Sequence, residues 1–537
     1  MKELPKINFK LSKELWSDNS YKHVQDMRTL IIMAATSFGN KIYLRSSNED
    51  DPNISFGELL IWASNFETYL EENKVQVGEK ISVIFHNSTL MVLLFLSTIF
   101  AKRIFVPINP LCSPNEIDYI LKDSEAKLLF FDGHLKNKIS STNTLEEKIE
   151  VKNQSEFIEN ILYENEKIVD VQSPVPNFPA QVVYTSGTTG DPKGVVLMHR
   201  NILADSYAIG KTFGFVIKDN FLTVTPLFHN SGQIMSTVGP LWCGGTTMAV
   251  RSDMGLLNFW YFVDQFSINW SLGMPTHVNF LLESPLRPEK KSMKGFFCGG
   301  AKLEPGPQNE FEERFGVPLY PNYGLTETTS IACCAWPHDL LSAPGSVGKP
   351  LFINEVKITN AAGRVEPYEV GEILIKGENL FKEYLNKPQV THESVKEGWL
   401  HTGDLGYMDE QGNLFLVDRV DNLILIGGEN VYPADVEKFI PKLDGIADAI
   451  LVAIPDKMLG NRLLLIYGTK QDEKADPAQW KKVFNANLSS YKIPKYFLNI
   501  KELGKNEIPK SPNGKILRNV VKNLVKEYFE KNNKIPF

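Results

Sequence analysis

The sequence predicts an α/β fold with a large N-terminal domain, residues 1–420, and a small α+β C-terminal domain, residues 421–537. Three observations lead to this prediction. Helical and strand patterns alternate from residue 20 to residue 170, which is typical of a sheet with parallel strands. The chain has 537 residues, 43% of them hydrophobic, and is too long for one ordinary domain. Near Val420 a strand runs into a polar segment, and a new hydrophobic block follows.

The N-terminal elements are expected in a regular order. Strands are predicted at residues 80–85, 104–108 and 127–131, and helices at 88–102 and 113–124. A capping box at Ser55 to Glu58 opens an earlier helix. Residues 134–170 are polar and rich in lysine, so a surface excursion is expected there. In the C-terminal domain the pattern predicts helices at 434–443 and 477–488, strands at 447–454 and 463–468, and a basic terminal helix from Lys515.

Composition excludes some classes of function. A formal net charge of -7 argues against a nucleic-acid-binding protein, whose electrostatic footprint is a basic face. No apolar stretch near the N-terminus suggests a secretory signal, and the apolar run at residues 90–101 is shorter than the roughly 20 residues that span a bilayer. The cysteines are odd in number and form no CxxC pair: Cys112, Cys243, Cys298, Cys333 and Cys334. A reduced, cytoplasmic protein without a metal-thiolate site is therefore expected.

The most constrained stretch lies between a strand that ends at Tyr184 and a strand that begins at Val195. It contains Thr185, Ser186, Gly187, Thr188, Thr189, Gly190, Asp191, Pro192 and Lys193. Glycines let backbone N–H groups approach an anion, hydroxyls add donors and a lysine adds positive charge, so the composition favours phosphate binding. A glycine-rich hairpin without a ligand is the alternative. It is not a Walker A loop, because Gly194 follows Lys193 where that motif has Ser or Thr.

This stretch closely resembles the phosphate-binding loop of the adenylate-forming superfamily, which includes acyl-CoA synthetases, firefly luciferase and the adenylation domains of peptide synthetases. Four more segments resemble signatures of the superfamily and follow in the family order: residues 320–328, 398–407, 417–433 and 508–518. With an earlier match at residues 101–110, the resemblance covers nearly the whole chain. It implies an N-terminal domain of several β-sheet subdomains with packed helices, and a small mobile C-terminal domain that turns about Asp421.

The resemblance also implies a nucleotide site. Asn322 and Tyr323 would contact adenine, with Gly324 beside them, and Thr326 would donate to the α-phosphate. Glu327 would hold Mg2+, a hard cation that prefers oxygen ligands. Asp404 would accept two hydrogen bonds from the ribose hydroxyls, with Arg419 nearby. Considered alone, Thr326 fits a helix cap and Asp404 an Asx-turn.

Further segments resemble the acyl and thiol parts of the site. After a predicted strand, Gly299, Gly300 and Ala301 would form the floor of the pocket, because small residues allow a flat ligand to approach. His229 resembles the residue that borders the carboxylate pocket, although a lone histidine is more often structural. Gly427 and Gly428 would line the pantetheine tunnel, and Lys515 matches the mobile lysine that reaches the substrate carboxylate and the α-phosphate.

The expected function follows from these parts. A carboxylic acid, fatty or another acyl acid, would react with ATP and Mg2+ to give acyl-AMP and pyrophosphate, and CoA would then take the acyl group. The expected catalytic residues are Thr185, His229, Glu327 and Lys515. Amino-acid-activating members of the superfamily have an Asp just after the matching Phe, which holds the substrate ammonium. In this chain His229 follows Phe228, so the resemblance implies an acid without an α-amine. The alternatives are transfer to the pantetheine of a carrier protein, and a non-catalytic nucleotide-binding relative. Peripheral membrane contact stays open, and no nucleic-acid partner is expected.

Overall fold

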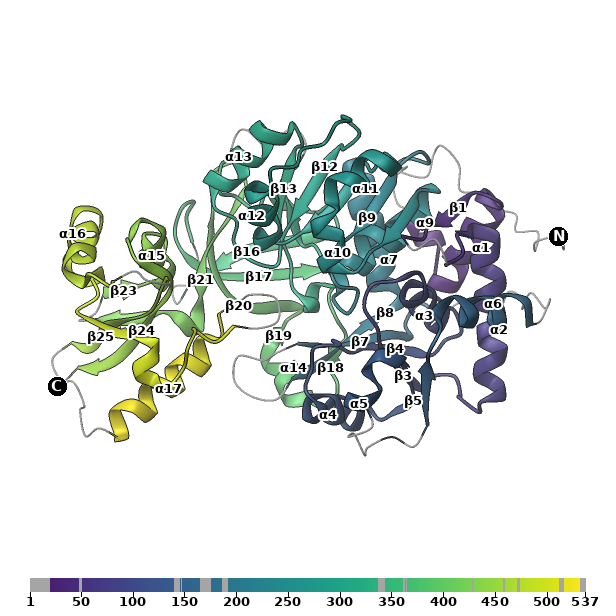
Figure 1. The fold of residues 1–537 in the computed structure, drawn as a ribbon, viewed down its shortest axis with the longest axis horizontal. Coiled ribbons are helices and arrows are strands. Elements are labelled where there is room, and N and C mark those ends of the chain that lie inside the picture. The colour runs from purple at the N-terminus through teal and green to yellow at the C-terminus, as the bar shows by residue number, and fades with distance from the viewer. Residues whose placement is uncertain are drawn as a thin grey trace. The chain divides into compact units, whose positions relative to one another are not determined.

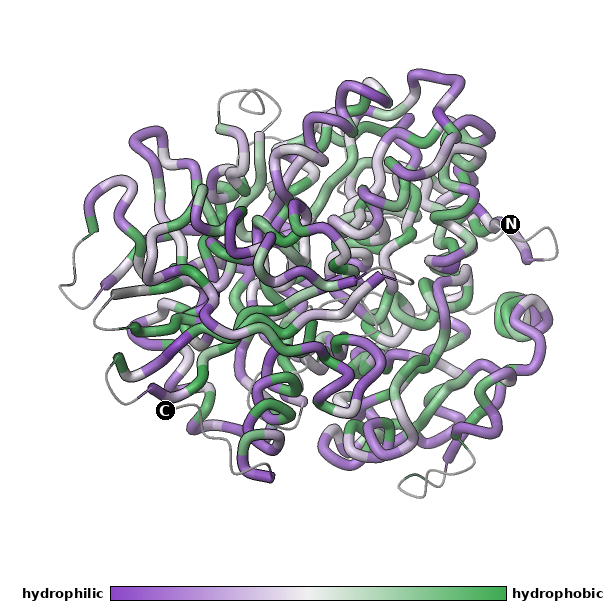
Figure 2. The backbone as a smooth tube through the Cα atoms, turned by 60° about the vertical axis from the view of Figure 1, so that its left-hand side comes forward, coloured by the Kyte–Doolittle hydropathy of each residue, from purple (hydrophilic) through white to green (hydrophobic). Residues whose placement is uncertain are grey.

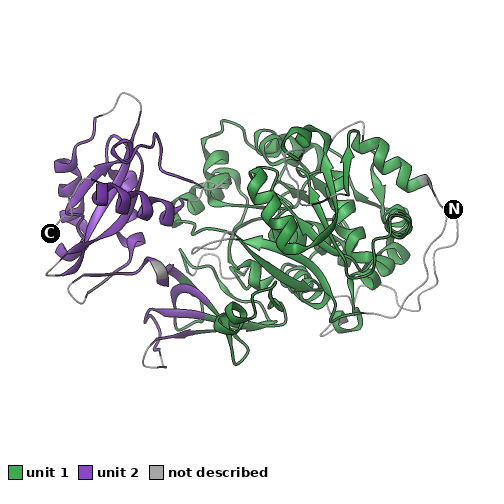
Figure 3. Ribbon diagram, turned by 90° about the horizontal axis from the view of Figure 1, so that it is seen from below, with its two compact units in different colours: residues 1–357, 374–401, 410–415 green, residues 358–373, 402–409, 416–537 purple. Residues whose placement is uncertain are grey.

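The computed structural model describes residues 20–47, 51–139, 145, 147–164, 175–185, 192–336, 343–360, 363, 365–426, 429–456, 459–470, 474–510 and 516–531. The chain divides into two compact units (Figure 3). The first comprises residues 1–357, 374–401 and 410–415, and the second comprises residues 358–373, 402–409 and 416–537. The predicted domain boundary at residues 420 and 421 stays a prediction.

The first unit contains two large sheets (Figure 1). One has the strand order β18-β8-β7-β4-β3-β5-β6. Its strands are β3 (Lys80–Ile84), β4 (Ile104–Pro107), β5 (Ala126–Asp132), β6 (Lys148–Val151), β7 (Pro179–Thr185), β8 (Lys193–Met198) and β18 (Glu383–Tyr384). β3, β4, β5, β6 and β7 run parallel to one another, whereas β8 is antiparallel to both β7 and β18. The parallel sheet predicted from the alternating pattern is confirmed.

The other sheet has the order β15-β14-β13-β12-β11-β9-β10-β1-β2. Its strands are β1 (Ile42–Leu44), β2 (Ile54–Ser55), β9 (Asn220–Thr223), β10 (Thr246–Ala249), β11 (Trp270–Gly273), β12 (Gly295–Cys298), β13 (Leu319–Tyr323), β14 (Cys333–Cys334) and β15 (Lys349–Pro350). From β10 to β13 the neighbours are parallel, so their carboxyl ends share one edge of the sheet. Ligands of open α/β sheets bind at that edge.

Helices fill the space around these sheets. They are α1 (Met27–Phe38), α2 (Phe56–Glu72), α3 (Thr89–Phe100), α4 (Pro114–Ser124), α5 (Lys136–Ile139), α6 (Gln154–Glu164), α7 (His199–Phe213), α8 (Asn230–Gln233), α9 (Gly239–Cys243), α10 (Ser252–Leu257), α11 (Phe259–Phe266), α12 (Pro275–Glu283), α13 (Pro305–Phe315) and α14 (Pro388–Ser394). One buried apolar cluster joins α1, α2, α3 and α7 to residues of both sheets. Figure 2 shows hydrophobic residues along the inner strands and hydrophilic residues in many outer segments.

The local signals are confirmed at the helix starts. Ser55 and Ser113 each form the full capping box, with Glu58 and Glu116 as the partners. The surface excursion predicted for residues 134–170 is wrong in part, because β6 and α6 lie there. Ile158, Ile161 and Leu162 of α6 are buried at helical spacing. Their contacts include hydrogen bonds from Trp62 Nε1 to Ile158 O and from Asn65 Nδ2 to Ile161 O, at 3.1 and 2.8 Å.

The second unit is built on a three-stranded sheet. Its strands are β24 (Ile446–Asp456), β25 (Gly460–Thr469) and β26 (Tyr496–Asn499), with β24 antiparallel and β26 parallel to β25. The helices are α15 (Pro433–Glu437), α16 (Pro477–Asn487) and α17 (Arg518–Lys531), and a hairpin is formed by β22 (Ile424–Ile426) and β23 (Glu429–Val431). Parts of β16 (Asn354–Thr359), β17 (Gly371–Gly377), β20 (Trp399–Met408) and β21 (Leu414–Arg419) also belong to this unit. A buried cluster lies on each face of the three-stranded sheet.

Across the part of the chain that the structure describes, no helix is both long and apolar enough to traverse a lipid bilayer. All five cysteines are free thiols, and four of them are buried.

Candidate active site

The site residues predicted in the first unit lie at strand ends. Thr185 ends β7 and Lys193 begins β8, and the two residues pair across the hairpin. In the other sheet, His229 follows β9, Gly300 and Ala301 follow β12, and Asn322 and Tyr323 end β13. β9, β12 and β13 are parallel strands of one sheet, so these groups gather at its carboxyl edge. The loop residues Ser186, Gly187, Thr188, Thr189 and Gly190 lie outside the described residues.

Tyr384 connects two of the predicted ligand-binding groups. Its hydroxyl donates a hydrogen bond of 2.7 Å to Glu327 Oε1. The ammonium of Lys193 lies 5.3 Å from the centre of the Tyr384 ring, within the range of a cation–π contact. β18 places the tyrosine there by pairing with β8, where Tyr384 lies opposite Val195. The sequence analysis missed Tyr384, since it lies 191 positions after Lys193 in the chain and only sheet pairing brings the two together.

The backbone around Glu327 is also held by the segment before Tyr384. Glu327 lies in a short 3-10 turn, Thr326–Thr328. Its carbonyl accepts a hydrogen bond of 2.8 Å from Phe381 N. On the other side, Asn230 Nδ2 donates to Thr326 O at 3.4 Å. The Thr326–Glu327 pair is therefore attached to β18 and to α8 at the same time.

The end of β13 has little room for larger side chains. Asn322 and Tyr323 are 8% and 6% exposed. A Cβ atom on Gly299 would lie 2.1 Å from Asn322 Oδ1, and one on Gly324 would lie 1.7 Å from the carbonyl oxygen of Ser330. Gly300 has a φ of +78° and is exposed, as is Ala301. Glycine at these positions keeps the strand ends free of side chains, so a ligand can approach the backbone there.

The loop that carries His229 is fixed from the opposite sheet. Asn87 lies between β3 and α3, and its Nδ2 donates to the carbonyls of Thr225 and Val250 at 2.9 and 3.1 Å. Its Oδ1 accepts from Leu227 N at 2.7 Å. Asn87 is 8% exposed, so these bonds satisfy a buried amide and join the two sheets at their carboxyl ends. The histidine ring follows two residues later, 4.5 Å from the ring of Phe228.

The second unit contains Asp404 and Arg419. Arg419 Nη1 donates to Asp404 Oδ1 at 2.8 Å, and Arg419 Nη2 lies 3.4 Å from Thr402 O. Gly403 has a φ of +68°, and a Cβ atom there would lie 2.8 Å from Arg419 Nη2. The hydroxyl of Thr402 accepts from Asp404 N at 3.0 Å, which closes this turn. The structure thus brings together the two residues predicted to lie near the ribose. Gly427, Gly428 and Lys515 lie outside the described residues.

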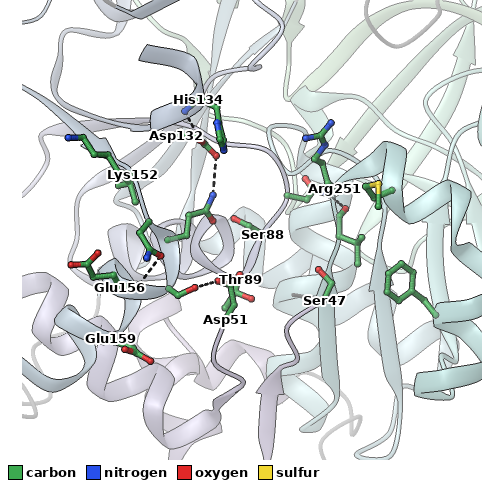
Figure 4. A pocket seen from close by; sticks show the side chains of 18 residues that line it. Ser47, Asp51, Ser88, Thr89, Asp132, His134, Lys152, Glu156, Glu159 and Arg251 are labelled. Carbon is green, nitrogen blue, oxygen red and sulfur yellow. Dashed lines mark hydrogen bonds between the residues drawn. The ribbon is translucent and has the colours of Figure 1, made fainter. Parts of the chain in front are cut away.

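A cavity of about 820 Å³ in the first unit is separate from the predicted ligand contacts (Figure 4). Its lining comes from residues at or after the ends of β3, β5, β6 and β10 and from α6, and it includes Asn87. Two of its charged groups have partners nearby: Asp132 Oδ2 accepts from Gln154 Nε2 at 3.1 Å, and Arg251 forms an ion pair with Asp253 at 2.6 Å. Among the predicted site residues that the structure describes, none lines this cavity.

A model of the family described as "AMP-binding enzyme" matches residues 33–385. The chain belongs to the AMP-binding enzyme family. It is 28% identical over 499 residues to a sulfoacetate–CoA ligase of Cupriavidus necator, covering 92% of this chain and 96% of that protein. It is 30% identical over 509 residues to a long-chain-fatty-acid–CoA ligase of Bacillus subtilis, covering 87% and 89%.

The similarity to solved structures supports membership of this family. The o-succinylbenzoate CoA synthetase (MenE) of Bacillus subtilis, in complex with the acyl-adenylate intermediate OSB-AMP, superimposes with a TM-score of 0.81 at 27% identity, over 92% of this chain and 97% of that one. The same enzyme has been solved with ATP and magnesium ion, also with a TM-score of 0.81. The predicted superfamily, fold class and enzyme class, an AMP-forming acid–thiol ligase, are confirmed. The roles of the individual site residues stay predictions.

Proposed function

We propose that this AMP-binding enzyme activates a carboxylic acid as its acyl adenylate and transfers the acyl group to CoA, with ATP, Mg2+ and CoA as its cofactors. One observation carries the assignment of the site: Tyr384 joins Glu327, at 2.7 Å, to Lys193, at 5.3 Å. A carboxylate suited to Mg2+ and an ammonium suited to phosphate thus lie against the same phenol ring. The two groups come from segments that resemble separate signatures of one superfamily.

Residues of each unit have chemistry suited to the metal or to the nucleotide. Glu327 supplies carboxylate oxygen for Mg2+, which would neutralise charge on the phosphates when bound. Thr185 and Lys193 lie opposite each other at the base of the hairpin loop and would hold the β- and γ-phosphates. Asn322 and Tyr323 would contact adenine. Asp404 would take the ribose hydroxyls, with Arg419 keeping the carboxylate in place.

The chemistry explains why two half-reactions are needed. A carboxylate is a poor acyl donor, because nucleophilic attack adds a second negative charge and oxide is a very poor leaving group. In the first step a carboxylate oxygen of the acid attacks the α-phosphorus, and the bond to the β-phosphate oxygen breaks, so pyrophosphate leaves. In the second step the CoA thiol loses its proton and attacks the acyl carbonyl, and AMP leaves. Lys515 would neutralise charge at phosphorus in the first step.

For the acid, we propose an acyl acid without an α-amine, such as a fatty acid. The 30% identical long-chain ligase of Bacillus subtilis supports this class. The sulfoacetate–CoA ligase and the o-succinylbenzoate CoA synthetase show that relatives of similar identity take very different acids. His229 and its buried neighbour Asn230 would border the carboxylate of the acid. A cytoplasmic place of action is part of this proposal.

The test is ATP–pyrophosphate exchange with a panel of acids of short, medium and long chain, together with aryl and sulfonated acids. We expect Mg2+-dependent exchange with at least one acid. Thioester should form when CoA is added. Absence of exchange with every acid would contradict the proposal. Exchange without CoA-dependent product, but with loading of a carrier-protein pantetheine, would favour the alternative acceptor.

A further inference from the structure

Asp205 is a buried carboxyl group to which the reaction scheme gives no role. It lies on α7, the helix that follows β8, and its side chain is fully buried. Oδ1 accepts a hydrogen bond from Asn379 Nδ2 at 3.1 Å, and Oδ2 accepts one from Ile331 N at 3.3 Å. Burial raises the pKa of this carboxyl to about 8, although both hydrogen bonds act in the opposite direction. A buried carboxyl is costly unless its partners are well placed, so its presence calls for a physical reason.

The residues that Asp205 contacts adjoin a strained turn. Thr329 has φ +63° and ψ −61°, and Ser330 N donates to Thr328 O at 2.7 Å. These values describe the rare γ-turn with a positive central φ, here with a β-branched residue at its centre. Such a conformation is unfavourable and persists only where the surroundings hold it. The turn begins one residue after Glu327.

Hydrogen bonds of Asn379 link the turn and its exit to α7. Thr329 Oγ1 donates to Asn379 O at 2.7 Å. Asn379 Nδ2 reaches both Asp205 Oδ1 and, at 3.4 Å, Ile331 O. The Ser330 carbonyl lies so close to Gly324 that no side chain fits there. Asp205 and Asn379 therefore bind the turn on its exit side, while Phe381 and Tyr384 bind Glu327 on its entry side.

We propose that Asp205 and Asn379 are positioning residues that keep the Thr328–Ser330 turn in its strained form and thereby fix where Glu327 presents its carboxylate. In this arrangement the strained form of the turn keeps Glu327 in place. A relaxed turn would shift the Thr326–Thr328 segment, and Glu327 would lose its placement between Tyr384 and the metal. The inference rests on the proposed function, because it takes Glu327 as the Mg2+ ligand.

The primary test is Asp205→Asn. The substitution preserves shape, but the new NH2 cannot accept a hydrogen bond. Either one of the bonds from Asn379 Nδ2 and Ile331 N is lost, or the Asn379 amide turns over and gives up its bond to Ile331 O. We expect the Mg2+ concentration for half-maximal ATP–pyrophosphate exchange to rise about 10-fold, the ratio that corresponds to the loss of one such bond. Binding of AMP without metal should weaken much less than the Mg2+ affinity, since that complex uses Thr326 of the same segment but not Glu327. Asn379→Ala is the second variant, with the same expectation.

Two comparisons separate positioning from a general loss of stability. Glu67→Gln also converts a buried carboxylate to an amide, but Glu67 pairs with Arg28 at 2.9 Å in α2 and α1, away from the turn. It should lower the melting temperature and leave the Mg2+ requirement unchanged. Thr329→Gly removes the strain, because glycine tolerates a positive φ, so Asp205→Asn combined with Thr329→Gly should recover most of the Mg2+ affinity.

The outcomes are distinguishable from those for the proposed function. If the wild-type enzyme shows no Mg2+-dependent exchange with any acid, the proposed function fails. If it does, but Asp205→Asn and Asn379→Ala keep the wild-type Mg2+ requirement, the positioning role is refuted. Equal losses of metal-free AMP binding and of Mg2+ affinity would refute it as well, and so would a failure of Thr329→Gly to restore Mg2+ affinity.

Discussion

Replacing Tyr384 by phenylalanine tests the contact on which the site assignment depends. The change removes one hydroxyl, whose oxygen lies 2.7 Å from Glu327 Oε1, and keeps the ring that packs on Phe381 and lies near Lys193. Tyr384 is only 7% exposed, so water has little access to replace the lost donor. In the wild-type enzyme this bond orders the Glu327 side chain before a metal binds.

The size of the effect follows from that ordering. Fixing a free glutamate side chain costs up to about 2 kcal/mol of rotamer entropy. In Tyr384→Phe the side chain of Glu327 is ordered only when Mg2+ binds, so this entropy loss weakens Mg2+ binding. Because about 1.4 kcal/mol corresponds to a factor of ten, the affinity for Mg2+ should fall about 10-fold. We would measure ATP–pyrophosphate exchange against Mg2+ at fixed ATP and acid. The maximal rate at saturating Mg2+ should change much less than the half-saturating concentration.

A matched control is present in the same unit. The hydroxyl of Tyr21 donates to Glu378 Oε1 at 2.9 Å, outside the predicted site, so Tyr21→Phe removes a similar bond and should leave the Mg2+ curve unchanged. The reasoning is refuted if Tyr384→Phe is folded and has the same Mg2+ dependence as the wild type. A shift of equal size in Tyr21→Phe would also refute it, since the effect would then not be specific to Glu327.

Four further outcomes are expected. Asp404→Ala should weaken ATP binding by about 10-fold or more and leave acid binding intact, because a carboxylate to a diol makes charge-assisted hydrogen bonds; unchanged ATP affinity in calorimetry would remove Asp404 from the site. Lys515→Ala should slow adenylate formation on the order of 100-fold, as for other groups that stabilise transition-state charge, but leave thioester formation from supplied acyl adenylate nearly intact; equal slowing of both steps in single-turnover experiments would contradict a role for Lys515 in the first step alone. Free amino acids should give no exchange, since no Asp follows Phe228, and robust exchange with any of the common twenty would overturn that expectation. Burial lowers the pKa of His199 from 6.5 to about 4, so the folded protein favours the neutral imidazole. The free energy of unfolding should therefore fall as the pH decreases from about 6.5 towards 4. The melting temperature of His199→Asn should decline less over that range, and an identical decline would exclude His199 as its source.

The sequence by itself was enough to predict the features that are formed by residues close together in the chain. The capping boxes at Ser55 and Ser113 involve residues three positions apart, so the helix starts could be predicted. The order of the signature segments was enough for the superfamily and the fold class, which the comparisons confirm. The candidate residues Asn322, Tyr323 and Glu327 could be named for the same reason, although their roles stay predictions.

Only the tertiary structure decided which distant residues support the site. Asp205 and Asn379 are 174 positions apart, and the hydrogen bond between Asn87 and Leu227 spans 140. Sheet pairing and helix packing create these contacts, and a periodicity that extends over a few residues carries no information about them. The incorrect prediction for α6 has the same cause. Its four apolar residues stand among charged residues in the sequence, and they form a buried face only because α6 packs against α2. Local patterns thus determined the elements and the motifs, whereas burial against distant partners determined how the turn of Glu327 is held.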